Sequence, residues 1–281
     1  MKYHEYIAQL AGKSVLYEVS TSPKPGLVDR HSNGAHTDMD FFTFMASSSA
    51  IHKGFYDITE ASSNFDGRPK ELLSLLRPIG IKMEEAMFKA TENVNTHKGI
   101  VFSLGLVAAA AVQVQPLEQN REKHISEYIM KMTEGISKEL FVPEKKIKTN
   151  GEIIFETFGF KGIRGEVESG FPTVFNSGLD ELRNSYYTFE CKNDLFIQTL
   201  FRIMSVCEDS NIISRHEPET LIEVQAMAKK FLESGGMHQE DGILQVKDMD
   251  NLFIKRHISP GGSADLLAVT IFLGLLENII K

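Results

Sequence analysis

The stretch GIVFSLGLVAAAAVQV, residues 99–114, is apolar on nearly every side when it is wound as a helix. A helix that is hydrophobic all round lies inside a protein core or a membrane. The run is shorter than the roughly 18 apolar residues that indicate a membrane-spanning helix. We therefore predict a central buried helix over residues 99–114, with the rest of the chain packed around it.

Helical spacing of apolar residues extends over most of the remaining chain. It predicts helices over residues 3–18, 41–55, 71–93, 121–141, 174–190, 194–208, 218–233, 247–257 and 263–280, with Pro78 as a kink or break in the third. Only residues 152–158 are a modest candidate for a strand. No internal repeat or Pro/Ser-rich linker divides the chain. We therefore expect an all-α fold, a single-domain multi-helix bundle that spans residues 1–281.

The composition is that of a soluble globular protein, since 42% of the 281 residues are hydrophobic and 24% are charged. The formal net charge of −8 argues against a nucleic-acid-binding protein, which normally carries a basic face. Two cysteines, Cys191 and Cys207, are too few for a disulfide framework, and we expect both to be buried and inert. The sequence shows neither a signal peptide nor a membrane span, so we expect a cytoplasmic protein.

Five interruptions between the predicted helices are rich in glycine and charge: residues 21–40, 95–99, 162–173, 209–215 and 259–265. The longest, TSPKPGLVDRHSNGAHTDMD at residues 21–40, has too many helix breakers for a helix and too few apolar residues for a buried strand. A long polar loop in a well-packed chain usually serves function. Each interruption lies at a predicted helix end, so together at one end of the bundle they would form a polar pocket.

Two of the interruptions have features of anion sites. Residues 259–263 place serine and glycine before an apolar helix, where free backbone N–H groups and the positive end of the helix dipole attract anions. Lys98 precedes the central helix, a position that is unfavourable for a cation unless a phosphate is bound. A plain helix cap at residues 259–263 and a solvated Lys98 are the alternatives.

Two further interruptions carry side chains suited to phosphate or metal. Arg164 and Glu166 combine an oxyanion-binding guanidinium with a carboxylate, although a surface ion pair explains them equally well. Asp209 and Asn211 offer oxygen ligands of the kind that Mg²⁺ prefers. A helix cap is the simpler alternative for this second pair.

Taken together, these segments resemble one known family. SPKPGLVDRHSNGAHTDMD (22–40), NTHKGIVFSLGL (95–106), RGEVESGFPTV (164–174), DSNIISR (209–215) and SPGGSADLLAVTIFL (259–273) are similar to motifs of the triphosphoribosyl-dephospho-CoA synthase family, in the family order. The resemblance extends from about residue 14 to residue 276. Members of this family serve citrate lyase or malonate decarboxylase.

The resemblance implies an all-α transferase whose substrates are ATP and 3′-dephospho-CoA, with Mg²⁺ as cofactor. The ribose 2′-hydroxyl of 3′-dephospho-CoA attacks C1′ of the ATP ribose, and adenine leaves. The implied product, 2′-(5″-triphosphoribosyl)-3′-dephospho-CoA, is the precursor of the prosthetic group of an acyl-carrier subunit. The client enzyme and the oligomeric state, a homodimer included, are left open.

The resemblance and this chemistry also suggest roles for individual residues. Displacement at an anomeric carbon passes through an oxocarbenium-like state, which a carboxylate stabilises and which needs a base for the incoming hydroxyl. We expect Asp29 or Glu166 to fill that role. The expected Mg²⁺ ligands are Asp38, Asp209 and Asp265. The expected contacts to phosphate are Lys24, Arg30, Lys98, Arg164, Arg215, Gly261, Gly262 and Ser263, and His36 and His97 are expected to contact phosphate or to protonate the leaving adenine.

The sequence departs from the family pattern beside Arg215, where His216 and Glu217 stand in place of an expected glycine pair and Ser210 replaces a threonine. An alternative enzyme is an all-α, Mg²⁺-dependent hydrolase of an N-glycosidic or ADP-ribosyl bond, which would use the same carboxylates with water as acceptor. A non-catalytic helical adaptor is a third interpretation, and the crowded charged loops argue against it.

Overall fold

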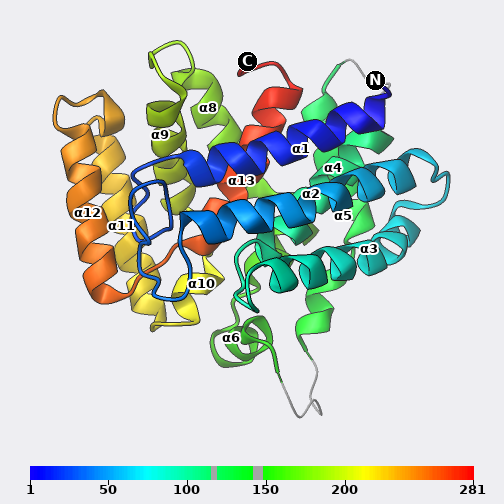
Figure 1. The fold of residues 1–281 in the computed structure, drawn as a ribbon, viewed down its shortest axis with the longest axis horizontal. Coiled ribbons are helices and arrows are strands. Elements are labelled where there is room, and N and C mark those ends of the chain that lie inside the picture. The colour runs from blue at the N-terminus through cyan, green and yellow to red at the C-terminus, as the bar shows by residue number, and fades with distance from the viewer. Residues whose placement is uncertain (115–118, 142–147) are drawn as a thin grey trace.

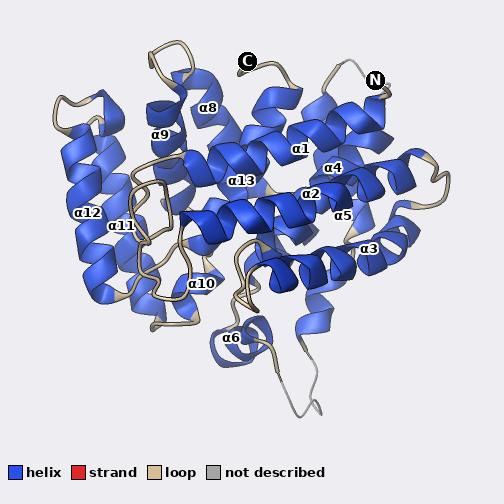
Figure 2. Ribbon diagram, in the orientation of Figure 1, coloured by secondary structure: helices blue, strands red, loops and turns tan. Residues whose placement is uncertain are grey.

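A computed structural model describes residues 1–114, 119–141 and 148–281 of the chain. Within these ranges the chain forms thirteen α-helices and three short helical turns, and it forms no β-strand (Figure 2). The α-helices are α1 (Tyr3–Ser20), α2 (Phe41–Ser63), α3 (Pro69–Ala90), α4 (Lys98–Gln113), α5 (Arg121–Met132), α6 (Asn150–Phe158), α7 (Gly162–Glu168), α8 (Leu179–Ser185), α9 (Lys192–Met204), α10 (Ser210–Ile213), α11 (Pro218–Glu233), α12 (Gly242–Arg256) and α13 (Gly261–Leu276). The short turns are η1 (Ile136–Leu140), η2 (Val174–Gly178) and η3 (Gly236–His238). The expected all-α fold is confirmed.

Two apolar helices, α4 and α13, lie at the centre of the fold (Figure 1). Residues 103–112 of α4 and residues 266–276 of α13 are all buried, and the two helices pack against each other. α1 packs on both of them, α2 packs on α4, and α8, α9 and η2 pack on α13. The predicted central helix is thus confirmed as α4, because a helix that is apolar all round must be covered on every side. No helix in the described part of the chain is long and apolar enough to cross a membrane.

The loop between α1 and α2, residues 21–40, lies where two groups of helices meet. α1, α2 and α3 run side by side, with α2 packed on both of its neighbours (Figure 1). α11 packs on α9 and lies with α12 at the left edge of the molecule (Figure 1). The loop extends from the end of α1 and the start of α2 toward α11 and α12, so it lies at the junction between the two groups.

Residues 152–158 are helical, and the prediction of a strand is wrong. They lie in α6, where Glu152 N donates to Thr149 Oγ1 at 3.4 Å and Thr149 N donates to Glu152 Oε2 at 2.8 Å. This reciprocal arrangement is a capping box. Gly159 ends the helix in the left-handed conformation, with φ 78°. The Thr-x-x-Glu start and the glycine stop outweigh a short alternation of apolar residues.

Some helix boundaries also differ from the prediction. The interruption at residues 162–173 contains α7, and most of the interruption at residues 209–215 is α10. The helix expected over residues 121–141 is divided into α5 and η1, because Gly135 adopts φ 82° between them. That division falls at a residue whose left-handed backbone conformation does not continue a helix.

Pro78 does not break α3, which continues through it. In a regular helix the carbonyl of Ser74 would accept from the N–H that proline lacks. Ser74 and Pro78 are both exposed, so water can bond that carbonyl. The solvent-facing position explains why the helix tolerates this proline.

The two cysteines have different surroundings. Cys207 is buried, as expected, and burial raises the pKa of its thiol well above the usual value. Cys191 is exposed, which contradicts the expectation that both would be buried, because it lies at the N-terminal cap of α9 rather than inside a helix.

Packing around α4 makes a direct prediction about stability. Leu104 is fully buried in α4, so Leu104→Ala should lower the free energy of unfolding by about 2–5 kcal/mol, through lost transfer energy and a cavity. Leu75→Ala, at a position of α3 that is 45% exposed, is the matched control and should cost only about 0.5 kcal/mol. Urea denaturation of both variants measures the difference, and equal losses would contradict the central placement of α4.

Candidate active site

The loop at residues 21–40 is folded around the carboxylate of Asp29. Lys24 N donates to Asp29 Oδ2 at 2.9 Å, while His31 N and Ser32 N donate to Asp29 Oδ1 at 2.8 and 3.1 Å. The Asp29 residue is only 1% exposed. Because a loop has few backbone partners of its own, a buried carboxylate can satisfy its N–H groups. Asp29 therefore fixes the shape of the loop, and its expected role at the reacting sugar stays a prediction.

Contacts to two helices hold this loop in place. Gly26 N donates to Asp250 Oδ1 on α12 at 2.8 Å. Asn193, in the first turn of α9, accepts from Ser22 N at 2.9 Å and donates to Ser22 O at 2.8 Å. Gly26 has φ 69°, and a Cβ there would lie 2.1 Å from Ile258 O, so only glycine fits. The loop is thus docked against α9 and α12.

Lys24 is buried beneath the loop and forms an ion pair with Glu18 near the end of α1. Lys24 Nζ also donates to Glu18 O at 2.9 Å. Burial raises the pKa of Glu18, although the charge of Lys24 acts to lower it. A buried charge is stable only when it is paired. The ammonium therefore neutralises Glu18, and the expected contact of Lys24 with phosphate would have to share or replace this pair.

Asp209 caps the N-terminus of α13. Its Oδ1 accepts from Asn211 N at 3.0 Å and from Gly262 N at 3.1 Å, and its Oδ2 accepts from Ser263 N at 2.7 Å and Ser263 Oγ at 2.9 Å. Gly261, the first residue of α13, lies beside the Asn211 side chain. Burial raises the pKa of Asp209, although the hydrogen bonds from Ser263 and Gly262 act to lower it.

The expected anion site at residues 261–263 therefore exists, and a side chain of the protein occupies it. N–H groups at a helix N-terminus carry partial positive charge and attract an anion. Here Asp209 supplies that anion and acts as the helix cap that the sequence left open as the simpler alternative. Contacts of Gly262 and Ser263 with phosphate, and of Asp209 with Mg²⁺, stay predictions.

Asp265 lies in the second turn of α13, and its carboxylate rests against the first turn of α4. A Cβ added to Gly99 would lie 1.8 Å from Asp265 Oδ2, so the approach requires glycine at position 99. Burial and the charges of Glu18 and Asp209 raise the pKa of Asp265 well above the usual range of an aspartate. Among the described residues this carboxylate has no hydrogen bond or ion pair, and it is partly exposed. It is therefore free to contact a ligand.

His97 is fully buried just before α4. Its Nδ1 lies 2.6 Å from Ser47 Oγ on α2, and Thr96 Oγ1 donates to the same Ser47 oxygen at 2.7 Å. That donation leaves the Ser47 proton for Nδ1 and places the ring proton on Nε2. Nε2 is buried without a hydrogen-bond partner in the described structure. Burial, together with the charge of Lys24, lowers the pKa of His97 to about 3, so the ring is neutral at pH 7.

Glu166 lies in α7 and binds the segment that precedes η2. Thr173 N donates to Glu166 Oε1 at 2.8 Å, and Thr173 Oγ1 donates to Oε2 at 3.0 Å. Burial raises the pKa of Glu166, although these hydrogen bonds act to lower it. The charges of Asp209 and Glu166 both act on the buried Cys207 thiol, which places Glu166 near the start of α13.

A second group of polar side chains lies nearer the surface. His36 Nε2 is 2.9 Å from Ser259 Oγ, and His36 Nδ1 is 3.7 Å from Asp38 Oδ1. Burial and the nearby charge of Arg215 lower the pKa of His36, while Asp38 acts to raise it. Asp38 and Arg215 are exposed, as is Arg30. The tip of the loop at residues 21–40 thus meets the segments that contain Arg215 and Ser259.

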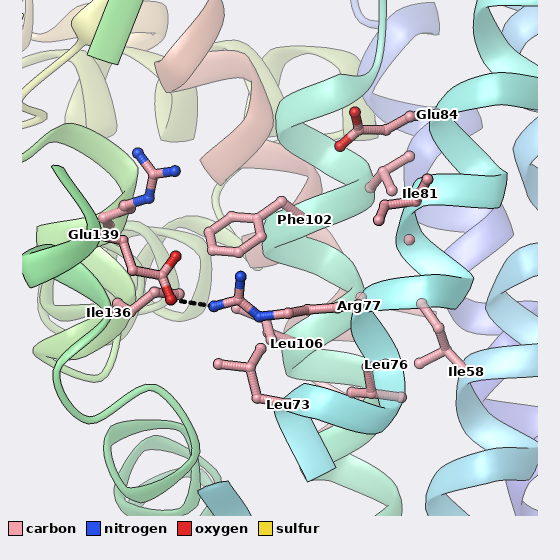
Figure 3. A pocket seen from close by; sticks show the side chains of 14 residues that line it. Ile58, Leu73, Leu76, Arg77, Ile81, Glu84, Phe102, Leu106, Ile136 and Glu139 are labelled. Carbon is pink, nitrogen blue, oxygen red and sulfur yellow. Dashed lines mark hydrogen bonds and ion pairs between the residues drawn. The ribbon is translucent and has the colours of Figure 1, made fainter. Parts of the chain in front are cut away.

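A cavity of about 240 Å³ lies between α3 and α4 (Figure 3). Arg164 lines this cavity, as does Glu84. Lys98 Nζ is 2.9 Å from Glu84 Oε2, so an ion pair offsets the unfavourable position of Lys98 at a helix N-terminus. Figure 3 shows a second ion pair, between Arg77 of α3 and Glu139 of η1.

The five polar interruptions do converge, as expected. Lys24, His97, Asp209 and Asp265 come from four of them and surround the adjoining N-terminal turns of α4 and α13. The fifth lies beside the interruption at residues 209–215, since a Cβ added to Gly162 would lie 3.2 Å from Ser210 Oγ and Gly162 N donates to Glu208 Oε1 at 2.8 Å. The exposed cations Arg30, Lys98 and Arg215 lie farther out.

The three expected metal ligands are not gathered into one shell. Asp38 pairs with His36, whereas Asp209 and Asp265 lie near the start of α13. The part of the chain that the structure describes contains no group of three or more His, Cys, Asp or Glu side chains placed to hold a metal ion. Mg²⁺ in nucleotide sites commonly uses one or two carboxylates together with substrate phosphates. The unbonded oxygens of Asp265 fit that looser arrangement.

Three residues of the site were not anticipated from the sequence: Glu18, Ser47 and Asp250. Each lies inside a predicted helix rather than in a polar interruption. The available signal was helical spacing, since Glu18 follows the buried Val15 by three residues and Ser14 by four. A charged residue on the buried face of a helix needs a partner, and here the partner is Lys24.

His97→Gln should reduce the loss of stability in acid. The folded-state pKa of about 3 lies below the ordinary value of 6.5, so the neutral ring contributes fully above pH 6.5, and this contribution is lost as the pH falls toward 3. Gln keeps an amide that can bond Ser47 and does not titrate. The melting temperature should therefore fall less between pH 7.5 and pH 4 in this variant.

The matched control is His52→Gln, at an exposed position of α2, which should leave the pH profile unchanged. If the melting temperature falls equally between pH 7.5 and pH 4 in His97→Gln and in the unchanged protein, His97 is protonated or exposed in the folded state.

Comparison with known proteins identifies the family. The model of the CitG family, ATP:dephospho-CoA triphosphoribosyl transferase, matches residues 4–281. A protein of Lactiplantibacillus plantarum is 37% identical over 277 residues, which cover 98% of each chain. A protein of Malonomonas rubra is 38% identical over 277 residues, or 97% of this chain and 88% of the relative. A protein of Vibrio cholerae serotype O1 is 37% identical over 282 residues, or 98% of this chain and 89% of the relative.

All three relatives carry the name probable 2-(5''-triphosphoribosyl)-3'-dephosphocoenzyme-A synthase. No solved structure matches the chain. The family match covers nearly the whole sequence, including all five polar segments that meet at the ends of α4 and α13. The chain therefore belongs to the ATP:dephospho-CoA triphosphoribosyl transferase family.

Proposed function

We propose that the chain transfers the triphosphoribosyl group of ATP to the 2′-hydroxyl of 3′-dephospho-CoA and releases adenine. Family membership supports the two substrates. Within the structure, the proposal depends on the Asp265 carboxylate, which lies where α4 and α13 meet. This carboxylate is partly exposed, has no hydrogen bond or ion pair among the described residues, and has a raised pKa. A group of this kind is suited to proton transfer.

The reaction forms a bond between the acceptor 2′-oxygen and C1′ of the ATP ribose and breaks the bond from C1′ to the adenine nitrogen. In the proposed mechanism Asp265 accepts the proton of the 2′-hydroxyl, and adenine leaves with the bonding electrons and takes up a proton. The carboxylates of Glu18 and Asp209, whose charges raise the pKa of Asp265, also favour positive charge nearby. The same arrangement would stabilise an oxocarbenium-like transition state.

Asp29 and Glu166 remain candidates for stabilising the positive charge on the sugar. Backbone N–H groups already bond both oxygens of Asp29, and Thr173 bonds both oxygens of Glu166. Their oxygens are therefore already satisfied within the protein, whereas the Asp265 oxygens are unbonded among the described residues. For this reason we assign the proton to Asp265.

The triphosphate would bind the exposed cations Arg30, Lys98 and Arg215, since guanidinium and ammonium groups form strong charge-assisted hydrogen bonds with phosphate. His97 would donate from Nε2 to a substrate atom, because that N–H is buried without a partner. With a pKa of about 3 the ring is a neutral donor at pH 7. Protonation of adenine by His97 would therefore require the bound substrates to raise that pKa.

We further propose that ATP binds as its Mg²⁺ complex, with phosphate oxygens as the main ligands and Asp209 as the expected carboxylate near the metal. When bound, the ion would neutralise charge on the triphosphate. The product would pass to the acyl-carrier subunit of citrate lyase or malonate decarboxylase. Subcellular fractionation and sedimentation analysis test the accompanying expectations of a cytoplasmic enzyme and a homodimer.

One assay tests the reaction. The purified protein is incubated with ATP, Mg²⁺ and 3′-dephospho-CoA, and free adenine and the mass of the triphosphoribosyl adduct are measured. Both should appear together. ADP or AMP in place of adenine would contradict the proposed transfer. Adenine and free triphosphoribose without dephospho-CoA would instead support the alternative N-glycosidic hydrolase.

Asp265→Asn should lower kcat by about 10²–10⁴-fold, as expected for loss of a general base, and should leave the KM for ATP within a few-fold. The variant should fold, because it removes a charge that Glu18 and Asp209 already disfavour. Asp248→Asn, at an exposed position of α12, is the matched control and should keep full turnover.

The turnover of Asp29→Asn and of Glu166→Gln, measured in the same assay, shows how much each of these two carboxylates contributes to the reaction. Near-normal turnover in both folded variants would remove these two residues from the chemistry. Near-normal turnover in Asp265→Asn would show that the base lies elsewhere.

A further inference from the structure

The cavity between α3 and α4 lies outside the group of carboxylates and has a different chemical character. Its volume is about 240 Å³, and its walls are largely aliphatic and aromatic. Figure 3 shows Leu73, Leu76, Phe102 and Leu106 around it, with the side chains coming from α3 and α4. Ligand sites are typically apolar with a few convergent polar groups. The charged groups that line this cavity are Arg77, Glu84, Glu139 and Arg164.

A glycine in the wall suggests that the cavity is kept open. Gly80 lies inside α3, where glycine weakens a helix relative to alanine. A Cβ added to Gly80 would have no atom within 4 Å, so neither backbone conformation nor packing in the described structure requires glycine there. A larger side chain at position 80 would project into open space beside the cavity. Space reserved for a ligand accounts for a glycine that the folded chain itself does not need.

The cavity lies next to the candidate active site. Glu84 lines the cavity and pairs with Lys98, the residue before Gly99, and Gly99 touches the Asp265 carboxylate. Arg164, two residues before Glu166, lines the cavity from α7. The ion pair between Glu84 and Lys98 therefore lies between one end of the cavity and the Asp265 carboxylate, which we assign as the base.

The chemistry of the two substrates indicates which part of them this cavity takes, an inference that rests on the proposed function. The reacting atoms are C1′ of ATP, which bears adenine, and the 2′-oxygen of dephospho-CoA, whose ribose bears the second adenine. Both nucleosides therefore lie at the reaction centre. The triphosphate is a polyanion and is excluded from apolar walls by its desolvation cost. The remaining part is the pantetheine arm of dephospho-CoA.

We propose that the cavity between α3 and α4 binds the pantetheine arm, with its dimethyl group against the aliphatic wall. Arg164 lines the cavity and would contact the diphosphate that joins the arm to adenosine. The volume is below the roughly 300–1,000 Å³ of sites that hold a whole drug-sized ligand. It suits one arm of the acceptor rather than a complete nucleotide.

Gly80→Leu tests this assignment without removing any contact of the folded chain. The leucine should fill the open space and strengthen the helix, so the melting temperature should not fall. The KM for 3′-dephospho-CoA should rise at least tenfold, while the KM for ATP stays within twofold. Lys82→Leu, which adds the same side chain at an exposed position of α3 outside the cavity, is the matched control and should change neither KM.

An acceptor without pantetheine tests the contribution of the pantetheine arm separately. ADP retains the adenosine and the diphosphate of dephospho-CoA and lacks pantetheine. Transfer to ADP at saturating ATP should be much slower than transfer to dephospho-CoA in the unchanged protein, and Gly80→Leu should not slow it further. A Gly80→Leu variant that impairs ADP and dephospho-CoA equally would overturn the proposal.

Calorimetric titration of dephospho-CoA into the protein without ATP separates this proposal from the proposed reaction. If Gly80→Leu weakens that binding at least tenfold but no adenine is released by the unchanged protein, the cavity assignment stands and the transferase function fails. If turnover is normal and Gly80→Leu changes neither KM nor binding, the cavity assignment fails alone. A rise in the KM for ATP only would show that the cavity holds the adenine of ATP, which also overturns it.

Discussion

The contact between the N-terminal turns of α4 and α13 is the constraint on which the rest of the site depends. Both helices are apolar along most of their length and pack against each other in the core. The start of α4, at Gly99, and the second turn of α13, at Asp265, therefore lie together. Two positive helix ends side by side need negative charge nearby. Asp209 caps one of them, and the Asp265 carboxylate lies against the other.

This arrangement separates charge within the site. Carboxylates lie inside, where Glu18 is neutralised by Lys24 and Asp209 by the N–H groups of α13, while Asp265 is left unbonded in the described structure. Exposed cations such as Arg215 lie outside. A site of this kind can hold a polyanionic nucleotide at its rim and stabilise positive charge at its centre. That combination suits displacement at a sugar carbon of ATP.

Much of the fold could be predicted, because the helical spacing of apolar residues indicates which face of each helix is buried. The central helix at residues 99–114 and the polar interruptions were predicted for this reason, since both are local properties of the chain. Residues 152–158 were misassigned because a short apolar alternation was weighed above the capping signal at Thr149 and the stop at Gly159. In a short segment, capping and stop signals of this kind can determine whether a helix or a strand forms.

The site was predicted less completely than the fold. Sequence patterns pointed to Asp209 and Asp265 as equivalent metal candidates, and only the packing shows that one caps a helix while the other is unbonded in the described structure. For Glu18 and Asp250 the sequence offered only helical spacing, which places each carboxylate on the buried face of its helix but does not identify the group that pairs with it. Their partners, Lys24 and Gly26, are in the loop at residues 21–40.

The sequence by itself determined the helical class of the protein, its apolar centre and the segments that supply charge, because hydrophobic spacing and turn residues act over a few positions of the chain. The tertiary structure decided which of those charges are satisfied. Hydrogen bonding and desolvation depend on neighbours that are distant in sequence, as Gly99 and Asp265 are. For that reason the order of chain segments revealed the family, whereas the free carboxylate and the open cavity beside it became visible only in the folded chain.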